Sequence, residues 1–235
     1  MIPKIIHYCW FGGKDLPDSA LKCIESWKRN MPEYEIKRWD ESNFDVNGIA
    51  YISEAYEMKK YAFVSDYARF KILYENGGVY FDTDVEIIRP LDKIVMAGPF
   101  MGVEKNNQIN PGLGMGSCRM MPFIGEMLKH YSTLRFLKED GSINYDTVVF
   151  YTTNKLREYG WTGKEKEIAG FKIYNKDYFC PLDYETNKLT ITKNTHTIHH
   201  YSATWITPKQ MLYRKIKHLF GEEFACFCSS IIKRK

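Results

Sequence analysis

The residues best suited to chemistry are two aspartates, Asp82 and Asp84, separated by one threonine. They follow the apolar residues 79–81, which read as a brief strand that ends where the carboxylates begin. Hard cations such as Mg²⁺ or Mn²⁺ bind a few carboxylates together with waters and substrate phosphates. Two carboxylates held close together repel each other, which is tolerable only in water or around a cation. We therefore expect a metal and diphosphate site, although a D-x-D pair by itself is common on solvated turns.

A second pair of charged residues, Asp66 and Arg69, lies upstream on a helix expected over residues 59–76. Three residues separate them, so they share a helix face. Two interpretations are open. An exposed ion pair would contribute less than about 1 kcal/mol to stability. Alternatively, both groups point into a cleft, where a carboxylate and a guanidinium bind sugar or ribose hydroxyls.

Alternating strands and helices are expected to position these residues. A strand over residues 4–9, a helix that begins near Asp18 and ends before Pro32, and a strand over residues 34–39 form a β-α-β unit. This order favours a parallel sheet with a helical crossover, and hence one α/β domain. The apolar residues of the first helix are Leu21, Ile24 and Trp27. Further strands are expected over residues 79–81, 85–88, 100–103 and 113–117, and further helices over residues 123–131 and 147–158.

The composition is that of an ordinary globular chain, but its charge is unevenly distributed. The 235 residues are 44% hydrophobic and carry a formal net charge of +4. Residues 209–235 hold seven Lys or Arg and two acids, so the remainder holds 26 basic and 27 acidic residues. A nearly neutral body gives poor support to a nucleic-acid-binding protein.

The six cysteines are scattered and show no paired metal-ligand spacing, so we expect reduced thiols. The first residues lack the apolar run of a signal peptide, and no segment approaches the roughly 20 apolar residues that span a bilayer. We therefore expect a cytoplasmic protein.

Three segments carry a resemblance to a known family. The pattern S-D-x-x-R-x-x-x-L-Y-x-x-G-G-x-Y-x-D-x-D over residues 65–84 resembles the signature of family 32 glycosyltransferases. Residues 2–10 are similar to the family's first strand, and residues 198–205 are similar to its late H-H-x-x-x-x-W segment. The family includes capsular-polysaccharide and lipopolysaccharide sugar transferases and yeast-type α-mannosyltransferases. The large clostridial glucosylating toxins carry a related arrangement.

The resemblance implies a GT-A fold, with a Rossmann-like, mixed and mostly parallel sheet flanked by helices. It also implies a metal-dependent hexosyltransferase that retains the configuration of the transferred sugar. The donor would be a nucleotide-sugar, with UDP-sugars favoured and GDP-sugars as the other option. Asp82 and Asp84 would bind Mn²⁺ or Mg²⁺, Asp84 more directly. Asp66 and Arg69 would hold sugar or ribose hydroxyls.

The outer segments would complete the donor site. Tyr8 and Trp10 would lie near the nucleotide base, although both also suit an ordinary core position at a strand end. Trp205 would contact the diphosphate. His199 or His200 would complete the metal or diphosphate shell, and neighbouring residues of a strand point to opposite faces. We expect one of the two to face the site and favour His200.

The sequence departs from the family around residues 109–116, which are richer in glycine than the corresponding strand of relatives. Asn110 and Asp146 are candidates for positioning the sugar or the acceptor. No carboxylate stands out as a nucleophile. A double displacement and a same-face attack assisted by the diphosphate therefore both remain open.

The last 28 residues, 208–235, form a basic amphipathic tail after a domain of residues 1–207. Apolar and basic faces suit an anionic membrane surface, and a C-terminal helix packed on the domain is the alternative. Family relatives in polysaccharide assembly often use lipid-linked acceptors, which would suit a peripheral position on the inner face of the cell membrane.

The leading functional hypothesis is a transferase that acts on a glycan or lipid-linked glycan in surface polysaccharide assembly, of the capsule or O-antigen type. The alternatives are a non-catalytic carbohydrate-binding protein on the same fold and a transferase that glycosylates protein. An aspartyl phosphatase fits poorly, because Glu86 stands where such enzymes carry Thr or Val.

Overall fold

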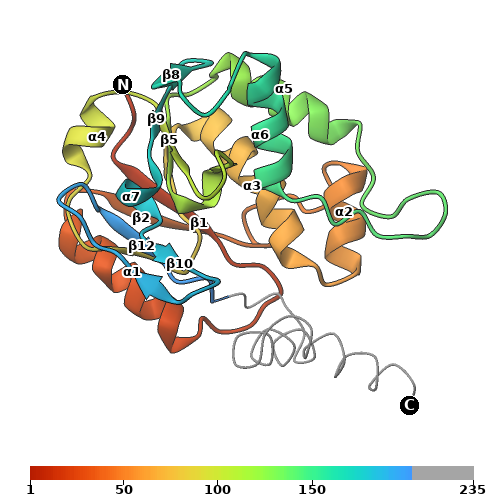
Figure 1. The fold of residues 1–235 in the computed structure, drawn as a ribbon. Coiled ribbons are helices and arrows are strands. Elements are labelled where there is room, and N and C mark those ends of the chain that lie inside the picture. The colour runs from red at the N-terminus through yellow and green to blue at the C-terminus, as the bar shows by residue number, and fades with distance from the viewer. Residues whose placement is uncertain (203–235) are drawn as a thin grey trace.

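The computed structural model describes residues 1–202 and shows a central β-sheet with helices on both faces. Figure 1 shows α1, α4 and α7 on one side of the sheet and α2, α3, α5 and α6 on the other. The helices are α1 (Asp18–Asn30), α2 (Ala50–Glu57), α3 (Tyr61–Asn76), α4 (Asp92–Met96), α5 (Pro122–Ser132), α6 (Val148–Glu158) and α7 (Lys176–Phe179), with a 3₁₀ turn, η1, at Pro111–Leu113.

The main sheet has eight strands in the order β2-β1-β3-β7-β5-β9-β8, with β6 paired to β5. Parallel pairing joins β1 to β2 and β3, and β5 to β9. The strands β6, β7 and β8 run antiparallel to their neighbours, so five of the eight strands share one direction. The strands are β1 (Ile5–Cys9), β2 (Glu35–Trp39), β3 (Gly78–Tyr80), β5 (Phe100–Val103), β6 (Ile109–Asn110), β7 (Met115–Ser117), β8 (Glu167–Ile168) and β9 (Phe171–Tyr174).

This arrangement confirms the expected α/β fold and its mixed, mostly parallel sheet. The first β-α-β unit lies where the sequence predicts it, and α3, α5 and α6 begin and end within two residues of the predicted bounds. Leu21 is an exception to the predicted apolar stripe of α1, because its side chain is 48% exposed. The strand expected over residues 113–117 begins at Met115, since the preceding residues form η1.

Two hydrophobic clusters form the core, one on each face of the sheet. Along β1, Ile6 and Tyr8 belong to the cluster beneath α1, whereas Cys9 belongs to the cluster beneath α3. On β3, Val79 belongs to the cluster beneath α1 and Tyr80 to the cluster beneath α3. Strands that are buried on both faces explain why this part of the sequence reads as continuous apolar runs.

The buried side chain of His7 ties three of these elements together. Its Nε2 donates to the carbonyl of Gly77 at 2.9 Å, and its Nδ1 accepts the indole N–H of Trp39 at 3.1 Å. These partners suit a neutral ring, and burial lowers the pKa of His7 to about 4. The segment that ends α3 and begins β3 is therefore fixed against β1 and β2.

A turn of two glycines joins α3 to β3. Gly77 ends the helix with a φ of +65° and donates its N–H to the carbonyl of Leu73 at 2.9 Å. Gly78 has a φ of +102°, and a Cβ there would lie 2.7 Å from the carbonyl oxygen of Ile5. Only glycine allows this close approach.

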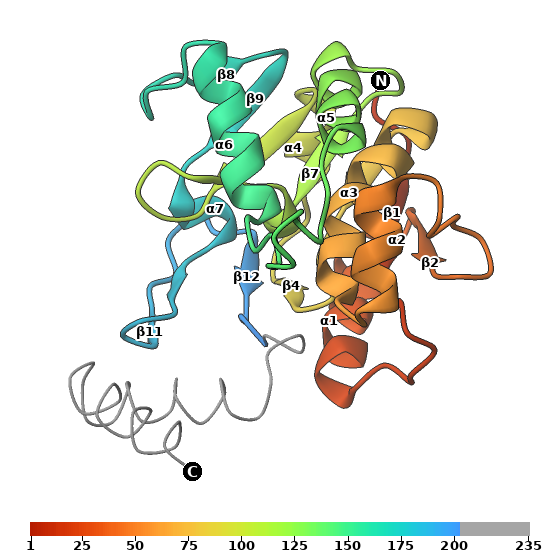
Figure 2. The same cartoon turned by 90° about the vertical axis from the view of Figure 1, so that its right-hand side faces the viewer.

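A second, two-stranded sheet pairs β4 (Val85–Ile87) antiparallel with β12 (Thr197–His199), and Figure 2 shows these strands side by side. A hairpin of β10 (Leu182–Asp183) and β11 (Lys188–Leu189) precedes β12. No helix among the described residues is long and apolar enough to cross a membrane. The basic tail, residues 208–235, lies outside the described part of the chain.

Candidate functional site

The turn that carries Asp82 and Asp84 follows β3 directly. The N–H of Phe81, whose side chain is fully buried, donates to the carbonyl of His7 at 3.1 Å. The N–H of Asp82 donates to the carbonyl of Gly112 at 3.0 Å, and the N–H of Val85 donates to the carbonyl of Asp82 at 3.1 Å. A buried strand therefore presents both aspartates at a fixed position, as the sequence predicts.

Asp82 is held by a buried guanidinium. Arg69 places Nη1 3.3 Å from Oδ1 of Asp82 and Nη2 2.7 Å from Oδ1 of Asp66. The Arg69 side chain is 3% exposed, its Nε donates to the carbonyl of Ser65, and its guanidinium lies 4.8 Å from the ring centre of Tyr80. One buried positive charge thus bridges two carboxylates, of which Asp66 is buried and Asp82 is partly exposed.

Both oxygens of Asp66 have partners within the protein. Oδ1 pairs with Arg69, and Oδ2 accepts the N–H of Val148, the first residue of α6, at 3.1 Å. Asp66 is 7% exposed. The structure shows a buried ion pair that reaches Asp82 and anchors the start of α6. A carboxylate at a helix N-terminus is also favoured by the helix dipole. A role of Asp66 and Arg69 toward sugar or ribose hydroxyls stays a prediction.

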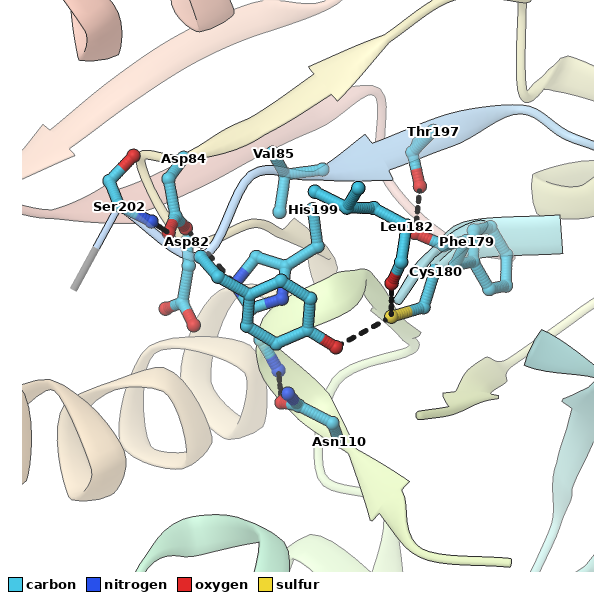
Figure 3. A network of polar contacts seen from close by, with 12 residues as sticks. Asp82, Asp84, Val85, Asn110, Phe179, Cys180, Leu182, Thr197, His199 and Ser202 are labelled. Atoms are coloured by element: carbon cyan, nitrogen blue, oxygen red, sulfur yellow. Dashed lines mark hydrogen bonds and ion pairs between the residues drawn. The ribbon is translucent and has the colours of Figure 1, made fainter. Parts of the chain in front are cut away.

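A glycine packs against the Asp82 carboxylate. A Cβ on Gly112 would lie 1.9 Å from Oδ2 of Asp82 and 2.9 Å from Nη1 of Arg69. Asn110 fixes this glycine, because its Oδ1 accepts the N–H of Gly112 at 2.7 Å. Asn110 is 6% exposed and lies in the same network as the aspartates (Figure 3). Its amide therefore positions the backbone beside Asp82.

Asp84 is held by residues 199–202, which lie more than 100 residues further along the chain. Its Oδ1 lies 3.2 Å from Nε2 of His199, and its Oδ2 accepts the N–H of Ser202 at 2.8 Å. The backbone carbonyl of Asp84 accepts the N–H of His200 at 2.9 Å. Figure 3 shows His199 and Ser202 directed toward Asp84. The pairing of β12 with β4 brings these residues together, because His199 lies opposite Val85.

The preference for His200 over His199 differs from what the structure shows. His199 is 8% exposed and faces Asp84, whereas the His200 side chain is 42% exposed and its Nε2 lies 2.8 Å from Glu86. The two rings point to opposite faces of the strand end, as expected. The register of β12 against β4 decides which ring faces the turn, and the sequence does not reveal that register.

Burial and charge pairing shift the pKa values of the ionisable groups of the site in opposite directions. Burial raises the pKa of the Asp66 carboxyl to about 6, against the pull of Arg69. Burial also disfavours charge on both Asp84 and His199, but their mutual attraction and hydrogen bond outweigh it. The pKa of Asp84 is therefore lowered and that of His199 is raised well above its usual value.

The residues of the turn fit a hard cation that keeps water and phosphate ligands. The side chains of Asp82 and Asp84 are 30% and 16% exposed, and Nδ1 of His199 is buried without a hydrogen-bond partner. Within residues 1–202, no three His, Cys, Asp or Glu side chains gather closely enough to hold a metal by themselves. Mg²⁺ ordinarily binds one or two carboxylates together with substrate phosphates rather than an all-protein cage.

The remaining candidates lie in different surroundings. Tyr8 is 7% exposed and packs edge-on against Trp27, so its ring belongs to the core. Trp10 is half-buried and its indole N–H donates to the carbonyl of Lys14 at 2.7 Å. Asp146 is exposed, two residues before α6. Their roles toward a base, a sugar or an acceptor stay predictions, and Trp205 lies outside the described residues.

Three residues of the site were not identified from the sequence: Gly112, Tyr201 and Ser202. The glycine-rich run of residues 109–116 was a signal, since a glycine amid apolar residues often marks a close backbone approach. Ser202 binds Asp84 through its backbone N–H, which carries no sequence signal. Tyr201 packs on His199 with ring centres 4.1 Å apart.

Known proteins resemble this chain in sequence. A family model described as the glycosyltransferase sugar-binding region containing the DXD motif matches residues 17–101. The uncharacterized glycosyltransferase L373 of Acanthamoeba polyphaga mimivirus is 31% identical over 202 residues, which cover 77% of this chain and 78% of that protein. Inositol phosphoceramide mannosyltransferase 3 of Schizosaccharomyces pombe is 27% identical over 169 residues, covering 70% of this chain. The chain spans 46% of the length of that mannosyltransferase.

A solved structure resembles the chain in its fold. PaToxG glycosyltransferase superposes with a TM-score of 0.51 at 18% identity, covering 67% of this chain and 69% of that one. This likeness concerns the arrangement of strands and helices. It agrees with the GT-A fold that the sequence motifs imply.

Proposed function

The chain belongs to the DXD-containing glycosyltransferases of family 32, and from this premise we propose that it is a retaining, metal-dependent hexosyltransferase. It transfers a sugar from a nucleotide-diphosphate donor to a glycan or lipid-linked glycan. The observation that carries the proposal is the convergence of Asp82, Asp84 and His199, which come from segments more than 100 residues apart. A non-catalytic carbohydrate-binding protein would not need this set of ionic groups, because neutral sugars are bound by hydrogen bonds and aromatic rings.

In this proposal the residues of the turn hold Mn²⁺ or Mg²⁺ together with the donor. Asp82 and Asp84 would supply the protein ligands, and His199 would hold the Asp84 carboxylate in place through Nε2, which lies 3.2 Å from its Oδ1. A divalent cation at this position stabilises the negative charge on a diphosphate leaving group. Arg69 is a positioning residue, because it fixes the Asp82 carboxylate while its own charge is shared with Asp66.

The donor sugar is proposed from the relatives. The name of the S. pombe relative states that it is an inositol phosphoceramide mannosyltransferase, which supports a hexose donor and a glycan or lipid-linked acceptor for this chain. Mannosyl and glucosyl donors carry different bases, so UDP-sugars and GDP-sugars are both included in the test. Surface polysaccharide of the capsule or O-antigen type is the proposed biological setting, and glycosylation of a protein is the alternative acceptor class.

Donor binding tests the proposal directly. The midpoint of thermal unfolding is measured with UDP- and GDP-sugars in the presence of Mn²⁺ or Mg²⁺, on the wild type and on Asp84→Asn. A ligand at a hundredfold excess over its Kd adds about 2.7 kcal/mol to the free energy of unfolding. We expect a metal-dependent rise that Asp84→Asn abolishes and that the surface variant Glu25→Gln keeps. No rise with any nucleotide-sugar, or the same rise in Asp84→Asn, would refute the proposal.

The stereochemistry of transfer has its own test. NMR of the first product formed shows whether the anomeric configuration of the donor is kept. A retained configuration supports either a double displacement or a same-face attack, whereas an inverted one contradicts the retaining mechanism. Incubation with a lipid-linked glycan and with a protein acceptor separates the two acceptor classes.

Attachment to a membrane is proposed for the basic tail, whose residues lie outside the described part of the chain. Its support is the sequence alone, in which Lys215 and Lys217 alternate with the apolar residues Ile216 and Leu219. The full chain should sediment with vesicles that contain phosphatidylserine. Reversing both charges, Lys215→Glu with Lys217→Glu, should weaken that binding, since each basic residue near the surface contributes about 1 kcal/mol. Unchanged sedimentation would contradict both the membrane contact and the peripheral cytoplasmic location.

A further inference from the structure

Aromatic rings form a continuous row that leads away from the aspartate turn. The ring of His199, which contacts Asp84, packs on the ring of Tyr201 with centres 4.1 Å apart. Tyr201 in turn packs on Tyr184 with centres 5.2 Å apart and planes inclined at 49°. The row therefore connects the proposed metal site with the turn between β10 and β11.

Tyr201, the middle ring of the row, is fixed both by its hydroxyl and by its backbone. The hydroxyl of Tyr201 lies 2.9 Å from the sulfur of Cys180. The backbone of Tyr201 has a φ of +50°, a conformation that bulky residues rarely adopt. Its neighbours explain why it persists, because the N–H groups of His200 and Ser202 both bind Asp84. Strain of this kind is a mark of functional positions.

The outer ring is accessible. Tyr184 is 41% exposed, although its ring packs against Tyr201. Its hydroxyl donates to Glu185 at 3.3 Å, and Nζ of Lys105 lies 5.5 Å from the ring centre. Lys105 and Glu185 also form an ion pair at 2.5 Å, so their charges offset each other. The surroundings of the ring are polar, and the carboxylate of Glu104 adds a negative charge near Tyr184 and Tyr201.

These contacts suit an uncharged sugar. One face of a hexose ring consists mainly of C–H groups, which pack on a flat aromatic surface, while its hydroxyls bind polar groups at the rim. Tyr184 offers the aromatic surface, and Lys105 and Glu185 offer a donor and an acceptor at its edge. An anionic sugar gains little here, because Lys105 is already paired.

We propose that Tyr184, supported by Tyr201, is the platform on which an uncharged hexose of the acceptor binds. The row of rings joins this platform to Asp84 and His199, so the acceptor lies beside the group from which the donor sugar departs. This inference rests on the proposed function. It adds the acceptor side of the site and the residue that selects for a neutral sugar ring.

The test measures acceptor binding and donor chemistry separately on the full chain. The probes are the methyl glycosides of mannose, galactose and glucose, with methyl glucuronide as the anionic counterpart. Their Kd values are measured by ligand-observed NMR in the presence of Mn²⁺ and UDP or GDP. The variants are Tyr184→Ala and Tyr184→Phe. Tyr159→Ala is the matched control, because Tyr159 is 44% exposed and its hydroxyl also bonds a glutamate.

We expect at least one neutral glycoside to bind the wild type and Tyr184→Ala to raise its Kd about tenfold, a change of about 1.4 kcal/mol. Tyr184→Phe and Tyr159→Ala should stay within about twofold of the wild type. Nucleotide binding and slow donor hydrolysis should be the same in all variants. Equal Kd values in Tyr184→Ala and the wild type, no binding of any neutral glycoside, or a preference for the glucuronide would overturn the inference. A wild type that binds no nucleotide-sugar would instead refute the proposed function.

Discussion

Asp82 and Asp84 lie two residues apart, yet different regions of the molecule hold them. Asp82 is held by side chains of its own segment, since Arg69 and Asp66 precede it by 13 and 16 residues on α3. Asp84 is held by residues 199–202, which arrive through the pairing of β12 with β4. The first arrangement is a buried ion cluster, and the second is a strand end that contributes one ring and two backbone N–H groups.

The difference has a physical consequence. A buried guanidinium between two carboxylates is sensitive to the loss of any one charge, because the remaining charges are then buried without a partner. The N–H groups that bind Asp84 belong to the backbone of His200 and Ser202, so no side-chain change removes them. The placement of Asp84 should therefore tolerate more substitutions among its neighbours. We therefore expect changes around Asp82 to affect stability more than changes around Asp84.

The largest effect is expected from Arg69→Met, which leaves Asp66 buried without its positive partner. The free energy of unfolding in urea should fall by about 3–5 kcal/mol. Arg135→Met is the matched control, because Arg135 also pairs with a glutamate but its side chain is 66% exposed. That control should change stability by less than about 1 kcal/mol. Equal losses in the two variants would show that the buried cluster is no more sensitive than a surface pair.

A pH series on Asp66→Asn probes the same cluster. The pKa of Asp66 is about 6 in the folded protein against an ordinary value of 3.8, so between these pH values the folded state binds more protons than the unfolded state. Lowering the pH from 7 to 4 should therefore stabilise the wild type relative to Asp66→Asn, by up to about 3 kcal/mol. The measurement is the difference between the two unfolding free energies at each pH. A constant difference would contradict the raised pKa.

The contribution of Asp84 to stability should depend on pH in the opposite sense to that of Asp66. Its pKa is lowered, so its contribution to stability is present above pH 3.8 and is lost as the pH falls further. Replacing its partner, His199→Gln, should cost about 2 kcal/mol, since a hydrogen bond between charged groups is lost. His200→Gln is the control, and its exposed contact with Glu86 should matter by less than about 1 kcal/mol. A larger effect at His200 would reverse the assignment of the two histidines.

A smaller effect is expected from Gly112→Ala, which presses on Asp82 without removing a charge. The added Cβ would lie 1.9 Å from Oδ2 of Asp82, so the carboxylate or the backbone must move. Overpacking of this kind costs about 1–3 kcal/mol. In Gly48→Ala the new Cβ would lie 3.4 Å from its nearest neighbour, so this control should be close to neutral. Metal-dependent donor binding should weaken in Gly112→Ala alone.

Much of the fold could be predicted from the sequence, because local patterns specify it. The strand–helix–strand opening, the long helix ended by Gly77 and the delivery of Asp82 by a buried strand are all where the sequence places them. The weakly patterned elements were not identified in advance: α2, α4, α7, β6 and the short strands β8 to β11. Strands of two to four residues have too few side chains to show a clear alternation.

The sequence by itself identified the charged groups that the structure brings together: the aspartate pair, the upstream Asp66 and Arg69, and one of two adjacent histidines. Only the tertiary structure decided how they combine. The register of β12 against β4 selected His199 over His200, and the close approach of Gly112 made Asp82 dependent on a backbone 30 residues away. The reason is that a residue's type sets the charge and hydrogen bonds it offers, whereas long-range pairing and packing set which partner it meets.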